Sequence, residues 1–276
     1  MDERKIERAI KLLQSIPQDG PIELCYSTGK DSDVILELAK MAGIPFEAIY
    51  KNTTCDQPGS IRHAKEMGVE IRQPRKNFLQ LMEEHGWPSR WTRFCCAYLK
   101  EYKIHDRAIV GIRRSESTAR AKRYTEPEQC RVYSSKEKVR QYFPILDWTD
   151  EDVAEFVKMR GLKLHPHYYD EQGNFDVKRR VGCIGCPLAG QKKEREEYIT
   201  YPSILKARIK AFCRWFESKK TLKTRELFTT PYEAVFFKLF CHGMREFKEK
   251  TDGMFGKVQD TEIKRYLEDY FKITLD

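Results

Sequence analysis

The sequence predicts an α/β protein with a doubly wound, mainly parallel sheet and a helical C-terminal extension. Between residues 22 and 71, short apolar runs alternate with segments whose apolar side chains recur at helical spacing, which is typical of strand–helix–strand units. A polar turn containing glycine joins the first apolar run to the helix that follows it. Beyond about residue 190 the strand signals end. We therefore expect two domains, at residues 1–190 and 191–276.

The individual elements follow from periodicity and from the residues that interrupt it. A leading amphipathic helix ends near Pro17, and the helix after the polar turn ends at Gly43. Thr149, with acidic residues after it, is a favourable start for a later helix that ends at Gly161. The expected order is a helix at 3–15, a strand at 22–26, a helix up to 42, a strand at 46–50, a helix at 60–67, a strand at 107–112, an irregular, partly mobile lid at 115–142 and a helix at 150–160.

Composition places the chain among globular proteins. With 276 residues, of which 40% are hydrophobic, it can bury a full core. The net charge of +9 suits phosphate-rich ligands, although a solvated basic surface would give the same value. No apolar run approaches the ~20 residues that a membrane helix needs, and the first five residues are too charged for a secretory signal. We expect a cytoplasmic location and no membrane partner.

Cysteine usage indicates metal or redox chemistry. Nine cysteines are many for a chain of this length, and an odd number cannot all pair with one another. Cys95 and Cys96 are adjacent, Cys183 and Cys186 form a Cys-x-x-Cys, and the others are single. In a reducing compartment, clustered cysteines are more often ligands than disulfides. The four clustered cysteines are candidate ligands of an iron–sulfur cluster, with a structural zinc ion as the rival.

The polar turn spans residues 27–32, Ser-Thr-Gly-Lys-Asp-Ser. Between a buried strand and a helix, such a turn presents backbone N–H groups and the positive end of the helix to an anion, and Lys30 adds charge. Its spacing differs from that of a Walker A loop, and an ordinary capped turn is the alternative interpretation. Asn52 and Thr53 follow the second strand and are expected at the same edge of the sheet, with Asp56 as a weaker candidate.

The turn resembles the Ser-Gly-Gly-x-Asp-Ser signature of the PP-loop ATP pyrophosphatases, with Thr28 where that pattern usually has glycine. Further motifs resemble the phosphoadenosine-phosphosulfate reductase family (PAPS/APS reductases) of this superfamily, in the family's order, over roughly residues 20–190. These are Gly111-Ile112-Arg113-Arg114 with Glu116, Ser117 and Arg120, then Phe143-Pro144-Ile145 with Trp148, then Gly182-Cys183-Ile184-Gly185-Cys186-Pro187. The likeness is to the 4Fe-4S type, which includes phosphorothioation-type sulfurtransferases.

This resemblance implies an adenine nucleotide alpha hydrolase-like fold, in which residues 1–190 form the PP-loop domain and also carry the cluster ligands. It implies a 4Fe-4S cluster, ATP or a sulfonucleotide (APS or PAPS), and Mg²⁺, for which Asp31 and Asp56 are candidate contacts. The implied catalytic residues are Lys30, Asp31, Lys100 and Arg113. The implied nucleotide contacts are Ser27, Thr28, Gly29, Lys30, Asp31, Ser32, Asn52, Thr53, Gly111, Arg113, Arg114 and Arg120. The implied cluster ligands are Cys95, Cys96, Cys183 and Cys186.

The C-terminal region departs from the assimilatory reductases of the family. Those enzymes carry a catalytic cysteine in a Glu-Cys-Gly-Leu-His motif, whereas the last cysteine here is Cys241, followed by His242. Cys241 is either a nucleophile beside a base or a buried structural thiol. We expect an ATP-using sulfur-transfer enzyme that adenylates an acceptor and releases pyrophosphate. A sulfonucleotide reductase that releases sulfite and a non-catalytic nucleotide- or nucleic-acid-binding module are the alternatives.

The expected partners are an adenine nucleotide, a sulfur donor or thiol reductant protein, and an acceptor for which DNA and tRNA are the candidates. One interpretation of the C-terminal region is a polynucleotide surface, because basic residues neutralise phosphates and aromatic rings stack on bases. The other is a helical core with a charged outer face. The residues concerned are Lys206, Arg208, Lys210, Arg214, Lys219, Lys220, Lys223 and Arg225, with Phe212, Trp215 and Phe216. The sequence leaves the oligomeric state open.

Overall fold

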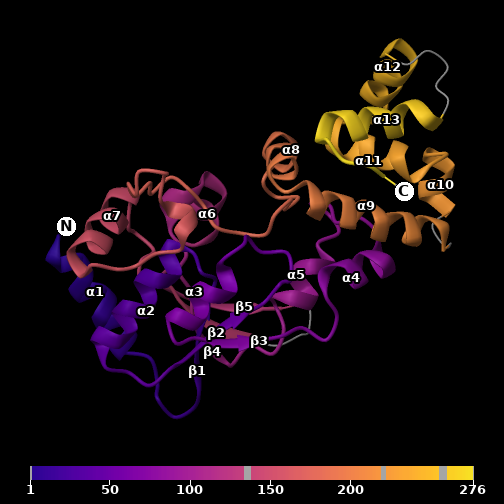
Figure 1. The fold of residues 1–276 in the computed structure, drawn as a ribbon. Coiled ribbons are helices and arrows are strands. Elements are labelled where there is room, and N and C mark those ends of the chain that lie inside the picture. Colours follow the sequence, from indigo (N-terminus) through magenta and orange to yellow (C-terminus); the bar gives the residue numbers. More distant parts are fainter. Residues whose placement is uncertain (1, 134–137, 219–221, 255–259, 276) are drawn as a thin grey trace. The chain divides into compact units, whose positions relative to one another are not determined.

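The computed structural model describes residues 2–133, 138–218, 222–254 and 260–275 (Figure 1). The chain folds into two compact units, which we call the sheet unit and the helical unit. The sheet unit comprises residues 1–74 and 96–182, and the helical unit comprises residues 75–95 and 183–276. The domain boundary near residue 190 stays a prediction, and the structure adds that residues 75–95 pack with the C-terminal helices.

The sheet unit is built on a six-stranded sheet. Its strands are β1 (Ile22–Tyr26), β2 (Glu47–Lys51), β3 (Glu70–Arg72), β4 (Arg107–Ile109), β5 (Glu128–Val132) and β6 (Lys138–Tyr142). They lie in the order β3-β2-β1-β4-β6-β5. All neighbouring pairs are parallel except β5 with β6, which is antiparallel. The predicted α/β class with a mainly parallel sheet is confirmed.

Helices pack around this sheet and form the main core with it. They are α1 (Glu3–Gln14), α2 (Lys30–Ala42), α3 (Ser60–Glu66) and α7 (Asp150–Arg160). The unit also contains α6 (Thr118–Arg123), which buries no residue, and short 3-10 turns at Arg114–Glu116 and Pro166–Tyr168. Helix α5 (Phe94–Leu99) spans the division between the units. The core joins Leu24 of β1 to Val34 and Leu38 of α2 and to Phe156 of α7.

Two helix boundaries show how local chemistry fixes the elements. Helix α2 ends at Gly43, which adopts a left-handed φ of 67° that glycine accepts without strain. Helix α7 begins at Thr149, whose side chain accepts a hydrogen bond from the backbone N–H of Asp152, and the Asp152 side chain caps Thr149 in return. Gly161 ends α7 with a φ of 61°. These predicted boundaries are confirmed.

Residues 115–142 do not form the predicted irregular lid. Helix α6 is followed by β5 and β6, which pair as an antiparallel hairpin at one edge of the sheet. The prediction was wrong because an edge hairpin buries only alternate side chains and therefore has a polar sequence. Val139 of β6 is fully buried, whereas its neighbours Lys138 and Arg140 are exposed. Residues 134–137 of the predicted lid lie outside the described residues.

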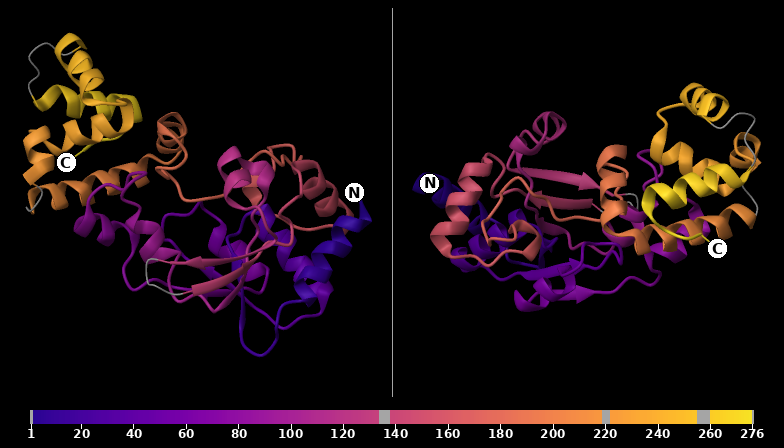
Figure 2. Two further views of the ribbon diagram at one scale, coloured as in Figure 1. Left: turned by 180° about the vertical axis from the view of Figure 1, so that it is seen from behind. Right: turned by 45° about the horizontal axis from the view of Figure 1, so that its top comes forward.

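The helical unit contains α-helices packed on an aromatic core, as predicted for the C-terminal region. They are α4 (Phe78–His85), α8 (Gln191–Thr200), α9 (Pro202–Glu217), α10 (Leu222–Leu227), α11 (Pro231–Phe240), α12 (Met244–Met254) and α13 (Asp260–Phe271). Figure 2 shows the helices coloured orange to yellow bundled against one another. Phe236 and Phe240 of α11 make ring contacts with Tyr266 of α13 at centroid distances of 5.5 and 5.4 Å. No helix in the described ranges is long and apolar enough to span a membrane.

The strand order reverses between β1 and β4. From β1 the chain proceeds outward through β2 to β3, and it then crosses to β4 on the other side of β1. In open α/β sheets the crevice at the carboxyl ends of the strands at such a reversal is the usual ligand site. The turn at residues 27–32 follows β1 directly and therefore lies at this crevice.

Candidate active site

A cavity of about 280 Å³ opens at the strand-order reversal, close to the lower limit of ~300 Å³ for small-molecule pockets. Its walls come from the ends of β1, β2 and β4, and every lining residue belongs to the sheet unit. Among them are six of the predicted site residues: Ser27, Ser32, Thr53, Lys100, Gly111 and Arg120. Asp56, the weaker candidate, also lines the cavity. The sequence motifs therefore converge on one place in the fold.

The turn after β1 has the backbone of a helix start. Gly29 is the N-cap of α2 with an extended backbone, φ −86° and ψ 154°, and the Ser32 hydroxyl donates to its carbonyl oxygen at 2.7 Å. Thr28 is fully buried and adopts a left-handed φ of 61°. Its Oγ1 has no hydrogen-bond partner among the residues that the structure describes. The left-handed backbone gives the physical reason for glycine at this place in the PP-loop signature.

Gly111, after β4, lets two backbones approach closely. A Cβ atom at this position would lie 2.9 Å from the carbonyl oxygen and 3.1 Å from the carbonyl carbon of Asp31. Backbone atoms cannot give way as a flexible side chain can, so only glycine fits here. The contact fixes the end of β4 against the first turn of α2.

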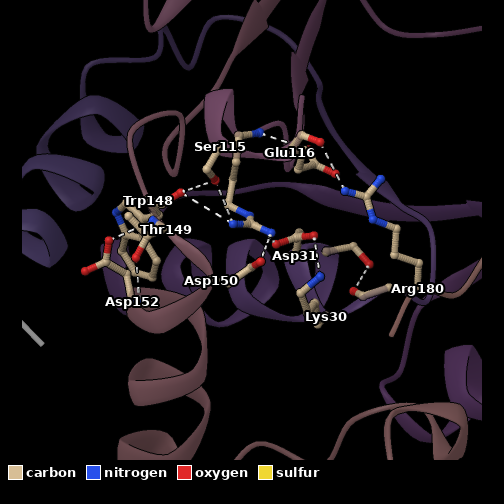
Figure 3. A network of polar contacts seen from close by, with 12 residues as sticks. Lys30, Asp31, Ser115, Glu116, Trp148, Thr149, Asp150, Asp152 and Arg180 are labelled. Carbon is tan, nitrogen blue, oxygen red and sulfur yellow. Dashed lines mark hydrogen bonds and ion pairs between the residues drawn. The ribbon is translucent and has the colours of Figure 1, made fainter. Parts of the chain in front are cut away.

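Arg113 supports the turn from a buried position. Its side chain is 1% exposed, and its Nε donates to Asp31 at 2.7 Å while Nη2 donates to Asp150 at 2.8 Å. Figure 3 shows Asp31, Asp150 and Ser115 directed toward one another in this network. Burial opposes the charged form, but the Asp31 and Asp150 carboxylates raise the pKa of Arg113 above its usual value. The guanidinium is therefore charged and holds Asp31 in place.

Lys30 belongs to the predicted phosphate-binding turn, but its side chain is buried. It is 3% exposed, and its Nζ lies 3.5 Å from an Asp31 carboxylate oxygen and 5.7 Å from the centre of the Tyr168 ring. The backbone N–H of Lys30 donates to the Tyr168 hydroxyl at 2.9 Å. Sequence reasoning missed Tyr168, which is 138 residues away and stands in no motif.

The two remaining predicted arginines have separate surroundings. Arg120 lines the cavity and pairs with Glu116, four residues before it on the chain. Arg114 pairs with Asp147, and its Nε donates to the carbonyl oxygen of Tyr124 at 2.8 Å. The structure thus brings Arg120 to the cavity, while the described contacts of Arg114 fasten α6 to the segment before α7.

Residues of the segment after β2 line two different cavities. Thr53 lines the cavity, and the Asp56 carboxylate accepts hydrogen bonds from the Tyr50 hydroxyl at 2.6 Å and the Thr53 N–H at 3.3 Å. Asn52 lines a neighbouring open groove of about 910 Å³. Its Nδ2 donates to Gln73 at 2.8 Å and its Oδ1 accepts from the Thr54 N–H at 2.9 Å. Of the predicted pair, only Thr53 reaches the cavity beside the turn.

A buried ion pair in the cavity wall was not foreseen. Glu23 of β1 and Lys51 of β2 are 1% and 8% exposed, and their charged groups lie 2.9 Å apart. Burial, with the Glu23 carboxylate beside it, raises the pKa of the Cys25 thiol well above its usual value. The available signal was a glutamate and a lysine within otherwise apolar strands, since such groups are rarely buried unless they are paired.

A second buried cluster lies under the first turn of α2. Asp33 is fully buried and accepts hydrogen bonds from the Tyr26 hydroxyl and from His63 of α3, whose Nε2 lies 3.0 Å away. The His63 ring makes an edge contact with His165 at a centroid distance of 5.8 Å. Asp33 therefore fastens β1, α2 and α3 together directly behind the turn.

The comparison with known families agrees with this geometry. The family described as phosphoadenosine phosphosulfate reductase domain matches residues 21–189, which is more than half of the chain. The chain belongs to this family. The resemblance inferred from the turn and its flanking motifs is thereby confirmed.

Two curated relatives illustrate the range of the family. The uncharacterized 37.8 kDa protein in the gpa 5′ region of Escherichia phage 186 is 32% identical over 149 residues, which covers 49% of this chain and 42% of the phage protein. Sulfate adenylyltransferase subunit 2 of Shewanella pealeana is 26% identical over 226 residues, covering 67% of this chain and 74% of the relative. The chain thus spans less than half the length of the phage protein. The Shewanella relative is an enzyme subunit, in agreement with the prediction of an enzyme.

Among solved structures, FMN adenylyltransferase of Candida glabrata in complex with FMN and the ATP analogue AMPCPP is similar to this chain with a TM-score of 0.43. The two are 14% identical, and the match covers 63% of this chain and 61% of that one. This likeness is too weak to support an argument about the site.

The predicted cluster ligands of this family member fall in both units. Cys95, Cys183 and Cys186 belong to the helical unit and Cys96 to the sheet unit, and all four are half-buried. Thiolates are the correct donors for an iron–sulfur cluster. However, no group of three Cys, His, Asp or Glu side chains suited to hold a metal occurs among the described residues. The donor chemistry fits and the four cysteines are divided between the two units, so the cluster stays a prediction.

The other C-terminal candidates are placed as follows. Cys241 ends α11 and is 3% exposed, and burial raises the pKa of its thiol to about 11. Phe212 and Phe216 are buried, which confirms the interpretation of these rings as part of a helical core. Arg208 is buried too, so its assignment to a charged outer or polynucleotide-binding face is wrong. Lys219 and Lys220 lie outside the described residues. Helical spacing alone could not distinguish the inner from the outer face of α9.

Proposed function

We propose that this chain binds ATP in the cavity at the strand-order reversal and transfers its adenylyl group to an acceptor oxygen, with release of pyrophosphate. The observation that carries the proposal is the Gly29 turn, which opens α2 at the carboxyl end of β1, with Gly111 packed against it. The N–H groups at a helix start bind phosphate. The similarity to sulfate adenylyltransferase subunit 2 supports adenylation rather than another use of the nucleotide.

In the proposed step the acceptor oxygen attacks the α-phosphorus of ATP. The bond between that phosphorus and the oxygen leading to the β-phosphate breaks, and pyrophosphate leaves with the electron pair. Ser27, Ser32 and the Gly29 turn would contact the phosphates, and Lys100 and Arg120 in the cavity wall would offset their charge. Arg113 would act by holding Asp31 and thus the shape of the turn.

Mg²⁺ is part of the proposal. Carboxylate oxygens are the ligands it prefers, and Asp56 in the cavity wall and Asp31 in the turn supply such oxygens. When bound with ATP, the ion would neutralise part of the charge on the phosphates. The residues therefore suit the ion in type.

Sulfur transfer through a 4Fe-4S cluster, with DNA or tRNA as the acceptor, is the finer part of the proposal. It is supported by the paired cysteines and by the family to which the chain belongs. A sulfur donor protein and a cytoplasmic location complete this proposal. It predicts iron and inorganic sulfide in anaerobically purified protein, whereas zinc in their place would contradict it.

A sulfonucleotide reductase is the second candidate, and the family's description favours it. The Cys241 thiol is 3% exposed, and its pKa is raised to about 11 by burial, which is unfavourable for a nucleophile. A reductase would therefore need a thiol from a separate reductant protein. Sulfite release from adenosine phosphosulfate that persists in Cys241→Ser would support this route. A binding module without turnover is the third candidate.

The test is a partial reaction under anaerobic conditions. Protein with ATP and Mg²⁺ should exchange radiolabelled pyrophosphate into ATP once an acceptor is supplied, with sulfate, DNA and tRNA tried separately. Lys100→Met should lower the exchange rate by about a hundredfold, because it removes a cationic contact to the phosphates. Lys122→Met, on the exposed face of α6, is the matched control and should leave the rate unchanged. Tight ATP binding with no exchange for any acceptor would refute adenylation.

A further inference from the structure

The Cys-x-x-Cys turn of the helical unit is built around a glycine that has no room for a side chain. Gly185 has a left-handed φ of 59°. A Cβ atom there would lie 2.2 Å from the Tyr198 hydroxyl oxygen and 2.4 Å from Nη1 of Arg208. The turn between Cys183 and Cys186 is thus pressed directly against two polar groups from α8 and α9.

We propose that Arg208 is a positioning residue, which shapes the Cys183–Cys186 turn so that both thiols face a common metal centre. Its guanidinium is 1% exposed. Nη1 donates to the Gly185 carbonyl oxygen at 3.2 Å, and Nη2 donates to the Ile184 carbonyl oxygen at 2.5 Å. These are the two residues between the cysteines. A planar guanidinium can bind two carbonyl oxygens at fixed angles, which a lysine ammonium does less well.

The guanidinium is itself held in place. Nη1 also donates to the Tyr198 hydroxyl at 2.6 Å, and the guanidinium carbon lies 4.3 Å from the centre of the Phe78 ring of α4. Three helices, α4, α8 and α9, therefore fix its position. A side chain of low mobility can impose its geometry on the turn that it contacts.

The turn is held from its other side as well. The Gly185 N–H donates to the Glu197 carboxylate at 2.6 Å, and burial raises the pKa of Glu197 above its usual value. Just past the cysteines, Nε of Arg90 donates to the Pro187 carbonyl oxygen at 3.4 Å. Both peptide groups of the turn thus have fixed partners within the protein.

The charge of Arg208 points to the same role. Its hydrogen bonds to the turn go to the neutral carbonyl oxygens of Ile184 and Gly185, so they set the geometry of the turn. A buried positive charge stabilises nearby anions such as thiolates and thiolate-bound metal centres. The proposed role of Arg208 rests on the proposed function in one respect, because that function assigns Cys183 and Cys186 to a metal.

The experiment compares Arg208→Met and Arg208→Lys with Arg245→Met in the 276-residue chain. Arg245 lies on α12 of the same unit and pairs with Glu249 at the surface, so its variant is the matched control. The measurements on anaerobically purified protein are iron, sulfide and zinc per chain, the visible spectrum, and amide hydrogen exchange across residues 183–186. Pyrophosphate exchange reports separately on the sheet unit.

Arg208→Met should lower metal affinity about tenfold, the usual cost of losing a group that orients metal ligands, and should speed amide exchange at Gly185. Arg208→Lys should recover part of the metal affinity and of the spectrum, which a purely structural role would not require. Pyrophosphate exchange should persist in all three variants. Wild-type metal content and amide protection in a folded Arg208→Met protein would overturn the proposal.

Two further outcomes separate this proposal from the proposed function. If the wild-type protein binds no metal, sulfur transfer fails, and positioning is judged from amide exchange: unchanged protection in Arg208→Met refutes it. If Arg208→Met does not fold, Glu197→Gln is used instead, because it weakens the other contact to Gly185. Metal content that is unchanged in Glu197→Gln and in Arg208→Lys would likewise count against the proposal.

Discussion

Two glycine turns, one in each unit, are backed by buried arginines, yet the arginines are satisfied differently. Behind the Gly29 turn, Arg113 pairs with the carboxylates of Asp31 and Asp150. Behind the Gly185 turn, Arg208 donates to two carbonyl oxygens and a phenol. Both side chains are 1% exposed. The first arrangement holds an acidic side chain, whereas the second fixes the backbone of a turn.

The largest effect is expected for Arg113→Met. The substitution removes the cation that pairs with Asp150 and leaves Asp31 with Lys30, whose Nζ lies 3.5 Å away. We expect the loss of this buried guanidinium to cost about 4 kcal/mol of unfolding free energy. Chemical denaturation measures the loss, and pyrophosphate exchange should fall with it. Arg140→Met on β6 serves as control, because the Arg140 side chain is exposed and, among the ion pairs of the described residues, makes only a surface pair with Glu128. A loss below about 1 kcal/mol, as for a surface pair, would remove the contrast between the two arginines.

Acid should weaken the sheet unit through His165. Burial, with His63, His167 and Arg62 nearby, lowers the pKa of His165 from 6.5 to about 4. Between these pH values the unfolded chain binds a proton at this side chain and the folded chain does not. The unfolding free energy attributable to His165 is therefore fully present above pH 6.5 and falls by on the order of 3 kcal/mol as the pH drops toward 4.

The measurement is denaturation at several pH values for the wild type and His165→Asn. The difference between the two proteins should shrink as the pH falls, whereas His105→Asn, just before β4, should follow the wild type. Because His165 also contacts Ser60 at 3.5 Å, at the start of α3, the loss should appear in the sheet unit. A constant difference across this range would show that His165 titrates normally.

Gly185→Ala tests the second turn directly. The left-handed backbone and the contacts at 2.2 and 2.4 Å mean that the added methyl must displace Tyr198 or Arg208. We expect a loss of about 2 kcal/mol from backbone strain and overpacking together, and a loss of bound metal. Gly182→Ala, where no atom lies within 4 Å of the added Cβ, is the control. Equal melting temperatures for the two variants would contradict the tight fit.

The smallest effect, of opposite sign, is expected for Thr28→Gly. The change relieves a left-handed backbone at a β-branched residue and removes a buried hydroxyl whose Oγ1 has no partner among the described residues. Glycine loses more entropy on folding, so the net gain in unfolding free energy should be about 1 kcal/mol. Thermal unfolding measures it. A destabilised variant would mean that the threonine packs favourably enough to outweigh the strain.

Local sequence signals predicted the turn at residues 27–32 better than they predicted the distant residues that contact it. The strand–turn–helix at residues 22–42 and the glycine at 43 follow from periodicity and from backbone conformations that only a few residues accept. The family motifs brought Gly111 and Arg120 to the same cavity. These features are encoded within short stretches of the chain, and short stretches are what a single sequence reveals.

The residues that hold the two glycine turns in place come from segments far apart in the sequence. Tyr168 reaches the Lys30 backbone across 138 residues, and His63 reaches Asp33 across 30. Nothing near either residue marks it as a partner. The burial of Arg208 was missed for the same reason, because an arginine between apolar residues of α9 looks like a surface charge until the turn it binds is known. The hairpin of β5 and β6 at the edge of the sheet was not predicted, because only one of its faces is buried and its sequence is therefore polar.

The hydrogen bond between the Lys30 N–H and the Tyr168 hydroxyl has a consequence for affinity. A phosphate that reaches this N–H must exchange places with the phenol, so the binding free energy is a difference between two hydrogen bonds. The cation–ring contact of Lys30 with the same tyrosine is exchanged in the same event. If a nucleotide binds at this turn as proposed, Tyr168 would compete with its phosphate for the Lys30 N–H, and a stronger hydrogen bond to Tyr168 would lower the affinity for the phosphate.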